Sequence, residues 1–148
     1  MDIADYKQYM LKKMPEGIPS DYVEAYFGSF IDSYAEISGL ISYSDKIIDV
    51  GCGPGFLVNY LSLIGFNIQG VDNYLYNPHA KLINEAINSK EMVTNQNIEN
   101  FQTSEKYDLI FLSNVVEHLS DWKTSLEFLN NILQENGKIV LLLPNYSF

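Results

Sequence analysis

The chain contains no arginine: all nine basic residues are lysines, set against 19 acidic residues, and the formal net charge is −10. Arginine is the side chain that most often binds phosphate and guanine, and a nucleic-acid surface needs a clustered basic face. The only adjacent basic pair is Lys12-Lys13. We therefore expect that the protein does not bind RNA or DNA directly.

Cysteine and long apolar runs are also scarce. A single cysteine, Cys52, excludes an internal disulfide and a cysteine-based metal cluster. The two histidines, His79 and His118, share no helical face with an acid, so no metal site is expected. No apolar run approaches the roughly 20 residues that span a bilayer. The N-terminal stretch, MDIADYKQYMLKKM, has acids where a secretory signal is basic. These absences predict a cytoplasmic protein without a membrane partner.

The apolar content is high enough to build one sizeable core, at 47% of 148 residues. Residues 1–45 read as an N-terminal helical cap of two helices, divided by Pro15 to Pro19. Ser20 is the expected N-cap of the second helix, because apolar residues follow it at helical spacing. Residues 46–148 are expected to form the core that carries function.

Strand and helix patterns alternate through this core. The predicted strands are Ile47 to Val50, Asn67 to Val71, Glu91 to Thr94, Tyr107 to Leu112 and Lys138 to Leu143. The intervening helices begin near Pro54, at an Asn77-Pro78 cap, and at Ser120 or Asp121, and Asn136-Gly137 is expected to end the last one. Strands separated by helices predict an α/β fold with a parallel sheet and right-handed crossovers.

A glycine-rich turn follows the first predicted strand, with glycines at 51, 53 and 55. Glycine permits positive φ and lets the backbone approach a ligand closely. A dinucleotide fingerprint would need its third glycine at position 56, where the chain has Phe56. The pattern D-x-G-x-G-x-G instead resembles the first motif of S-adenosylmethionine-dependent methyltransferases. Cys52 lies inside this turn, and it can be read as a small packed residue or as a nucleophile.

Three further motifs extend the resemblance to residues 46 to 145 or so, and they are Gly70-Val71-Asp72, Tyr107 to Leu119, and Asn136 to Ile139. With the glycine turn, they are similar in kind and order to motifs of small-molecule methyltransferases like those of ubiquinone and menaquinone biosynthesis. The resemblance implies a Rossmann-like three-layer sandwich with a mainly parallel sheet in the order 3-2-1-4-5, and S-adenosyl-L-methionine as cofactor. The usual last two strands have no counterpart, so the sequence is expected to be a piece of a longer protein or a minimal form.

Asp72 ends the second predicted strand, at the distance from the glycine turn where an acid in a doubly wound fold reaches a ribose. Its alternative reading is an ordinary solvated acid. By the same geometry Asn97 would face the adenine amine with its carbonyl, and Ile98 would pack on the ring. The full set that we expect to bind the cofactor is Asp49, Gly51, Cys52, Gly53, Gly55, Asp72, Asn73, Asn97, Ile98, Ser113 and Asn114.

His118 is the candidate general base, because it follows the strand end that faces the reacting methyl group. Its alternative reading is a packed histidine that bonds to backbone, and His79 is expected at the surface. Five aromatic residues of the N-terminal helices could form a lid over the cofactor or simply pack on the sheet: Tyr22, Tyr26, Phe27, Phe30 and Tyr34.

The function predicted from the sequence is methyl transfer from S-adenosylmethionine to a small-molecule acceptor, with O-methylation favoured. Ser113 to Val116 lacks the Pro-Pro-aromatic motif of methyltransferases that modify nucleic-acid or protein amide nitrogens. The alternative is a cofactor-binding module without its own catalysis, completed by a partner or by further strands. The last predicted strand is an apolar sheet edge, which predicts a homodimer through that edge unless the N-terminal helices cover it.

Overall fold

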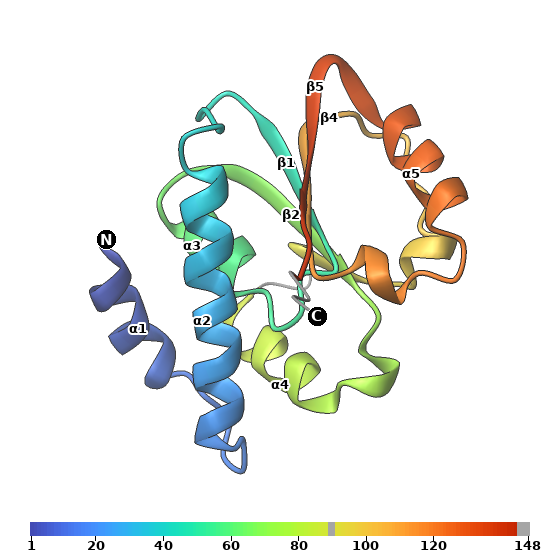
Figure 1. Ribbon diagram of the computed structural model, residues 1–148. Helices are drawn as coiled ribbons and strands as arrows, with labels where there is room; N and C mark the ends of the chain where they lie inside the picture. The colour runs from blue at the N-terminus through green and yellow to red at the C-terminus, as the bar shows by residue number, and fades with distance from the viewer. Residues whose placement is uncertain (89–90, 145–148) are drawn as a thin grey trace.

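A computed structural model describes residues 1–88 and 91–144 and shows a five-stranded sheet with helices on both faces (Figure 1). The sheet consists of β1 (Lys46–Val50), β2 (Asn67–Asp72), β3 (Val93–Asn95), β4 (Tyr107–Ser113) and β5 (Leu133–Leu142). The helices are α1 (Ile3–Leu11), α2 (Ser20–Ile37), α3 (Phe56–Leu63), α4 (Pro78–Ile87) and α5 (Trp122–Asn131). There are also three short 3-10 helices, which are η1 (Tyr74–Tyr76), η2 (Ile98–Asn100) and η3 (Val116–His118).

All strand pairs are parallel, and their order is β3-β2-β1-β4-β5. Side chains alternate along β4: Leu109 and Phe111 join the core cluster beneath α1 to α4, whereas Ile110 and Leu112 join the cluster beneath α5. Figure 1 shows α2 and α5 on opposite sides of the sheet. The predicted Rossmann-like three-layer fold and its strand order are thus confirmed. The end of the predicted core domain, residues 145–148, lies outside the described residues.

Three predicted boundaries are wrong. The third strand runs from Val93 to Asn95 and does not begin at Glu91. Ser20 is the first helical residue of α2 and not its cap, because Pro19 occupies the cap position in an extended conformation without a side-chain hydrogen bond. Asn136-Gly137 does not end α5 but lies inside β5. The backbone N–H of Tyr107 donates to Ile132 O at 2.9 Å, so pairing with β4 begins directly at the helix end. The register then shifts between Tyr107 and Leu109.

The other predicted caps hold. The Asn77 side chain accepts a hydrogen bond from the Ala80 N–H at 3.1 Å, and Asp121, rather than Ser120, accepts from Thr124 N–H at 3.1 Å. These bonds satisfy backbone donors that the first turn of a helix leaves free. They place the starts of α4 and α5 beside the carboxyl edge of the sheet.

The two N-terminal helices pack on the sheet face that also carries α3. Tyr6 of α1 is fully buried among the rings of Phe27, Phe30 and Tyr60, and its hydroxyl donates to Phe56 O at 2.9 Å. The helices therefore share one core with the sheet face, and they do not form a separate hydrophobic unit. Within the described residues, no helix combines the length and the apolar composition that crossing a bilayer requires.

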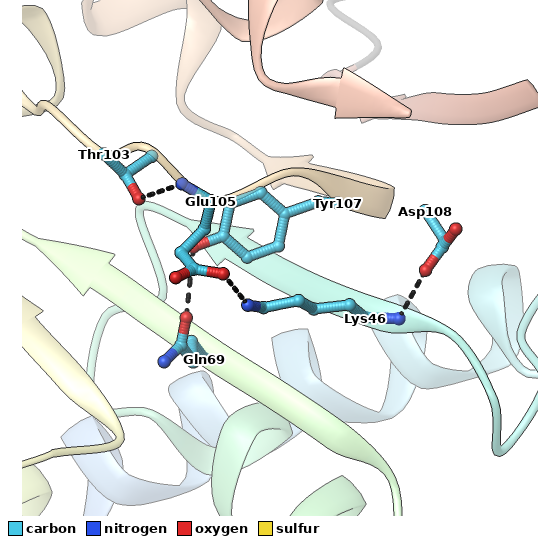
Figure 2. Close-up of polar contacts among 6 residues, drawn as sticks. All are labelled: Lys46, Gln69, Thr103, Glu105, Tyr107 and Asp108. Atoms are coloured by element: carbon cyan, nitrogen blue, oxygen red, sulfur yellow. Dashed lines mark hydrogen bonds and ion pairs between the residues drawn. The ribbon is translucent and has the colours of Figure 1, made fainter. Parts of the chain in front are cut away.

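Polar contacts hold the amino ends of β1, β2 and β4 together (Figure 2). The Lys46 backbone N–H donates to Asp108 Oδ2 at 2.8 Å, and its ammonium group pairs with Glu105. The Tyr107 hydroxyl donates to Gln69 Oε1 at 3.0 Å. A pocket of about 330 Å³ lies at this edge, lined by Asp45, Asp108 and residues from the start of β5, and a larger cavity lies at the opposite, carboxyl edge.

Candidate functional site

A cavity of about 820 Å³ lies at the carboxyl ends of β1, β2 and β4, a volume in the range of small-molecule sites. Its walls come from α2, the glycine turn after β1, the loop after β3, and the segment from β4 through η3. The lining residues are Tyr26, Ser29, Phe30, Ser33, Asp49, Gly51, Cys52, Gly53, Pro54, Phe56, Leu57, Val71, Asp72, Asn73, Asn77, Gln96, Asn97, Ile98, Glu99, Phe111, Ser113, Asn114, Val115, His118 and Leu119.

The glycine turn forms the floor of this cavity and is held against β2. The N–H groups of Gly51 and Cys52 both donate to Val71 O, at 2.7 and 3.2 Å. Gly51 has a φ of 76°, and a Cβ atom there would lie 2.2 Å from the Val115 side chain. The turn therefore needs glycine for its conformation and for its contact with the segment after β4.

Gly55 was expected among the residues that touch the ligand, but it does not line the cavity. It caps α3 in a left-handed conformation, and its N–H donates to Cys52 O at 2.9 Å. A Cβ atom would lie 2.8 Å from Asn84 Oδ1 on its other side. Gly55 therefore shapes the turn without facing the cavity.

Gly70 of β2 supports the turn from below. A Cβ atom at this position would lie 2.8 Å from Cys52 Sγ and 2.9 Å from Val58 Cγ2. Burial raises the pKa of the Cys52 thiol well above its ordinary value, which keeps it protonated. Both observations favour the packed reading of Cys52 over the nucleophile.

Asp72 lies at the end of β2 with its carboxylate turned to the glycine turn. Its Oδ2 accepts a hydrogen bond from the Gly53 N–H at 2.7 Å. Burial raises the pKa of this acid, and the hydrogen bond from Gly53 opposes the rise. Asp72 is thus no ordinary solvated acid. A ribose would meet a carboxylate of which one oxygen is already bonded to the turn.

Asp49 is a buried acid, with 4% of its surface exposed, at the end of β1. Burial, with a smaller contribution from the charge of Asp72, raises its pKa to about 8. Among the described residues, no hydrogen bond to the Asp49 carboxylate from a side chain or backbone N–H is found. The cavity therefore presents a carboxylate that a cationic ligand group would stabilise in its charged form.

Helix α2 forms one wall of the cavity and is tied across it by Asn77. The Tyr22 hydroxyl donates to Asn77 Oδ1 at 2.6 Å, and Asn77 Nδ2 donates to the Tyr26 hydroxyl at 2.9 Å. Farther along the helix, Ser33 Oγ donates to Ser113 Oγ at 3.2 Å. These hydrogen bonds join α2 to residues 51 to 80 positions later in the chain, and they hold the helix over the glycine turn.

The five predicted lid aromatics divide between two roles. Tyr26 and Phe30 line the cavity, whereas Phe27, like Phe30, is buried in the aromatic core. Tyr22 contacts the cavity wall through Asn77, and Tyr34 packs against the ring of Tyr60. Packing on the sheet is thus confirmed for Phe27 and Phe30, and a lid over the cofactor stays a prediction for Tyr26 and Phe30, which line the cavity.

The loop after β3 brings Asn97 and Ile98 to the cavity, as predicted. The Asn97 side-chain oxygen, however, accepts from the Glu99 N–H at 3.0 Å and so caps η2 instead of facing the cavity freely. Glu99 in turn accepts from the Ser120 N–H at 2.8 Å, and bonds to the Ser120 hydroxyl and backbone lower its pKa. The loop is therefore fastened to the start of α5.

Ser113, Asn114 and His118 line the cavity where the chain leaves β4. Asn114 has a φ of 54°, and its N–H donates to Leu142 O at 2.8 Å. His118 ends η3 with an exposed side chain, which disagrees with the packed reading. Because His118 lines the cavity, its role as a general base stays a proposal.

Sequence reasoning missed four polar residues of the cavity, Ser29, Ser33, Asn77 and Gln96, as ligand-facing groups. Asn77 was recognised only as a helix cap. Ser29 and Ser33 stand one helical turn apart, which is the only signal that both face the same way. No pattern in the sequence states that α2 packs over the glycine turn.

Comparison with known proteins identifies the family. A sequence profile described as a methyltransferase domain matches residues 22–148, which is most of the chain. The chain belongs to this methyltransferase-domain family. Ubiquinone biosynthesis O-methyltransferase of Dictyostelium discoideum is 30% identical over 116 residues, covering 70% of this chain and 36% of that protein. Probable polyketide synthase 22 of the same organism is 29% identical over 123 residues, covering 68% of this chain and 5% of that protein. The chain thus spans about a third of the first protein's length and a small part of the second.

Solved structures agree with the fold of the family. An amino pentose methyltransferase from Micromonospora echinaspora, CalS10 with bound S-adenosylmethionine, superimposes with a TM-score of 0.68 at 16% identity, covering 90% of this chain and 60% of that one. The glycopeptide N-methyltransferase MtfA, also with S-adenosylmethionine, gives 0.60 at 11% identity, covering 76% and 53%. At these identities the likeness shows the shared fold alone. Within residues 1–88 and 91–144, no three His, Cys, Asp or Glu side chains gather as a metal site.

Proposed function

We propose that this methyltransferase domain binds S-adenosyl-L-methionine in the cavity and transfers its methyl group to a small-molecule acceptor. The observation that carries the proposal is the pair of partly or fully buried acids, Asp49 and Asp72, on either side of the glycine turn. An ammonium or sulfonium group would stabilise the charged form of Asp49, and Asp72 offers acceptors for ribose hydroxyls. Membership of the family and the binding named for related structures support this assignment.

The chain's residues would hold the cofactor in a fixed order along the cavity. The glycine turn and Asp49 hold the methionine end, Asp72 and Asn73 the ribose, and Asn97 and Ile98 the adenine. When bound, S-adenosylmethionine supplies a methyl group on a sulfonium centre, which needs no further activation. The residues Ser113 and Asn114 face the end of the site at which an acceptor would enter.

The main contribution of the protein is then positioning. Holding donor and acceptor in line with water excluded can account for about 7 to 11 kcal/mol of a barrier. The wall from α2 excludes water from one side of the cavity. For a hydroxyl acceptor, His118 would take the proton that the oxygen loses. O-methylation is the reaction named for the ubiquinone relatives, and for this chain it is part of the proposal.

The experiment is calorimetric titration with S-adenosylmethionine and S-adenosylhomocysteine, with NAD as the control ligand. We expect both adenosyl compounds to bind and NAD not to bind. Transfer of labelled methyl to a panel of hydroxyl and amine acceptors then separates an enzyme from a binding module without catalysis. Binding of NAD alone would overturn the assignment. The cytoplasmic location stays a prediction, since several similar enzymes are mitochondrial by name.

A further inference from the structure

The charged side chains around the cavity are almost all of one sign. Asp49, Asp72 and Glu99 line it, whereas no lysine is found among the described lining residues and the chain has no arginine. His118 is the one lining side chain there that can become positive. A cavity with acids and low-dielectric walls has a negative potential, which attracts cations and repels anions.

Burial decides how strongly these charges act. Asp49 is almost wholly buried and Asp72 is mostly so, so salt screens their fields less than that of an exposed acid. Glu99 is exposed, and its carboxylate accepts hydrogen bonds from the Ser120 and Asp121 N–H groups. In the free protein near neutral pH Asp49 is mostly protonated, so the potential at the floor of the cavity comes chiefly from Asp72, and Asp49 adds to it when a cationic group binds and ionises it.

The wall opposite the glycine turn is polar but uncharged. This wall contains Ser29 and Ser33 of α2 and, from the end of β4, Ser113 and Asn114. The Ser33 hydroxyl donates to Ser113 Oγ at 3.2 Å and so joins the two segments. Hydroxyl and amide groups can donate and accept hydrogen bonds, but they do not neutralise a carboxylate or phosphate. An anionic group placed here would lose its hydration without gaining a counter-charge.

Resting on the proposed function, we propose that the site selects acceptors by charge: it takes small neutral or cationic molecules and rejects those with a carboxylate, phosphate or sulfate group. Ser29 and Ser33 of α2 are the residues that make this wall uncharged, and they are therefore specificity-determining. The cofactor itself contains a carboxylate, but this is accompanied in the same molecule by an ammonium and a sulfonium group.

The test uses three catechols that differ only in the charge of the side chain: 4-(2-aminoethyl)catechol, 4-ethylcatechol and 3-(3,4-dihydroxyphenyl)propanoate. Their dissociation constants are measured by calorimetry on the protein saturated with S-adenosylhomocysteine, and methyl transfer is followed with S-adenosylmethionine. We expect the amine and the neutral catechol to bind about tenfold or more tightly than the carboxylate. Equal or tighter binding of the carboxylate overturns the inference, and so does a failure of all three to bind.

Two lysine variants on the same helix make the result specific. Ser29→Lys adds a positive charge at the cavity wall, and Ala35→Lys adds the same charge at an exposed position of α2 that lies outside the lining and on another side of the helix. Ser29→Lys is expected to reduce or reverse the preference against the carboxylate, and Ala35→Lys to leave it unchanged. An equal response of the two variants overturns the role of Ser29.

The same experiment separates this inference from the proposed function. If S-adenosylhomocysteine does not bind, the proposed function fails. If it binds and the carboxylate is preferred, only the charge selection fails.

Discussion

Binding of S-adenosylmethionine should depend on pH through Asp49. With a pKa of about 8 from burial, this acid is mostly protonated at neutral pH in the free protein, and a cationic ligand needs it ionised. Binding of the cationic ligand therefore releases a proton from the Asp49 carboxyl group. The ionised fraction is about 0.09 at pH 7.0 and about 0.003 at pH 5.5, so the affinity should rise by about 30-fold across this range.

The measurement is calorimetric titration at pH 5.5, 6.0, 6.5 and 7.0. This range stays below the titration of the ligand's own amino group, near pH 8. At pH 7.0, two buffers of different ionisation enthalpy should show release of about 0.9 proton per bound ligand. Asp49→Asn keeps the shape of the side chain and should bind weakly, without this slope. A slope that remains in the variant belongs to other cavity groups, such as Asp72.

The same raised pKa affects stability with a defined sign. The folded pKa lies above the unfolded value near 3.9, so the folded state binds the extra proton between about pH 4 and 8. Stability of the ligand-free protein should fall as pH rises through this window, by at most about 1.4 kcal/mol per pH unit. Asp49→Asn should flatten this fall. A flat affinity profile together with a flat stability profile in the wild type would refute the reasoning about Asp49.

Three further predictions concern the turn and the sheet edge. Asp72→Ala should weaken binding of S-adenosylhomocysteine by about 1.5 to 3 kcal/mol in calorimetry, and unchanged affinity in a folded variant would make the acid irrelevant to the ligand. Gly70→Ala should lower the free energy of unfolding by about 1 to 3 kcal/mol in urea, because the methyl group meets Cys52 and Val58. Gly28→Ala, on an open face of α2, is its control and should be neutral or stabilising. The outer edge of β5 should pair two chains into a dimer, and a monomer of 16.9 kDa in sedimentation at micromolar concentration, with amides 139–143 protected from exchange, would contradict this.

The sequence was sufficient for the parts of the fold with local signals. The β-branched runs and the caps at Asn77 and Asp121 placed strands and helices, because periodicity and capping act over a few residues. The glycine spacing likewise located the floor of the cavity. By contrast, the pairing of residues around Gly137 with β4 depends on a long-range register, which no local pattern encodes.

The candidate site divides in the same way. Asp49, Asp72 and Ser113 lie at the carboxyl ends of strands, so the rule that carboxyl ends of parallel strands converge was enough to bring them together. Ser33 reaches Ser113 only because α2 packs over the sheet, a contact between residues 80 positions apart. The burial that changes the acidity of Asp49 is also a property of the assembled core, and it has no counterpart in the sequence.

The left-handed backbone of Asn114 limits how the edge of the cavity can vary. At a φ of 54° most residues with a Cβ atom incur about 1 to 2 kcal/mol, whereas glycine, asparagine and aspartate are tolerated. The side chain at this position lines the cavity, so the backbone restricts its chemistry to hydrogen, amide or carboxylate. Exchange between these three would change the polarity of this part of the cavity with little disturbance of the fold. Among proteins that share this turn, this position is therefore the first at which to look for substitutions that change the polarity of the cavity.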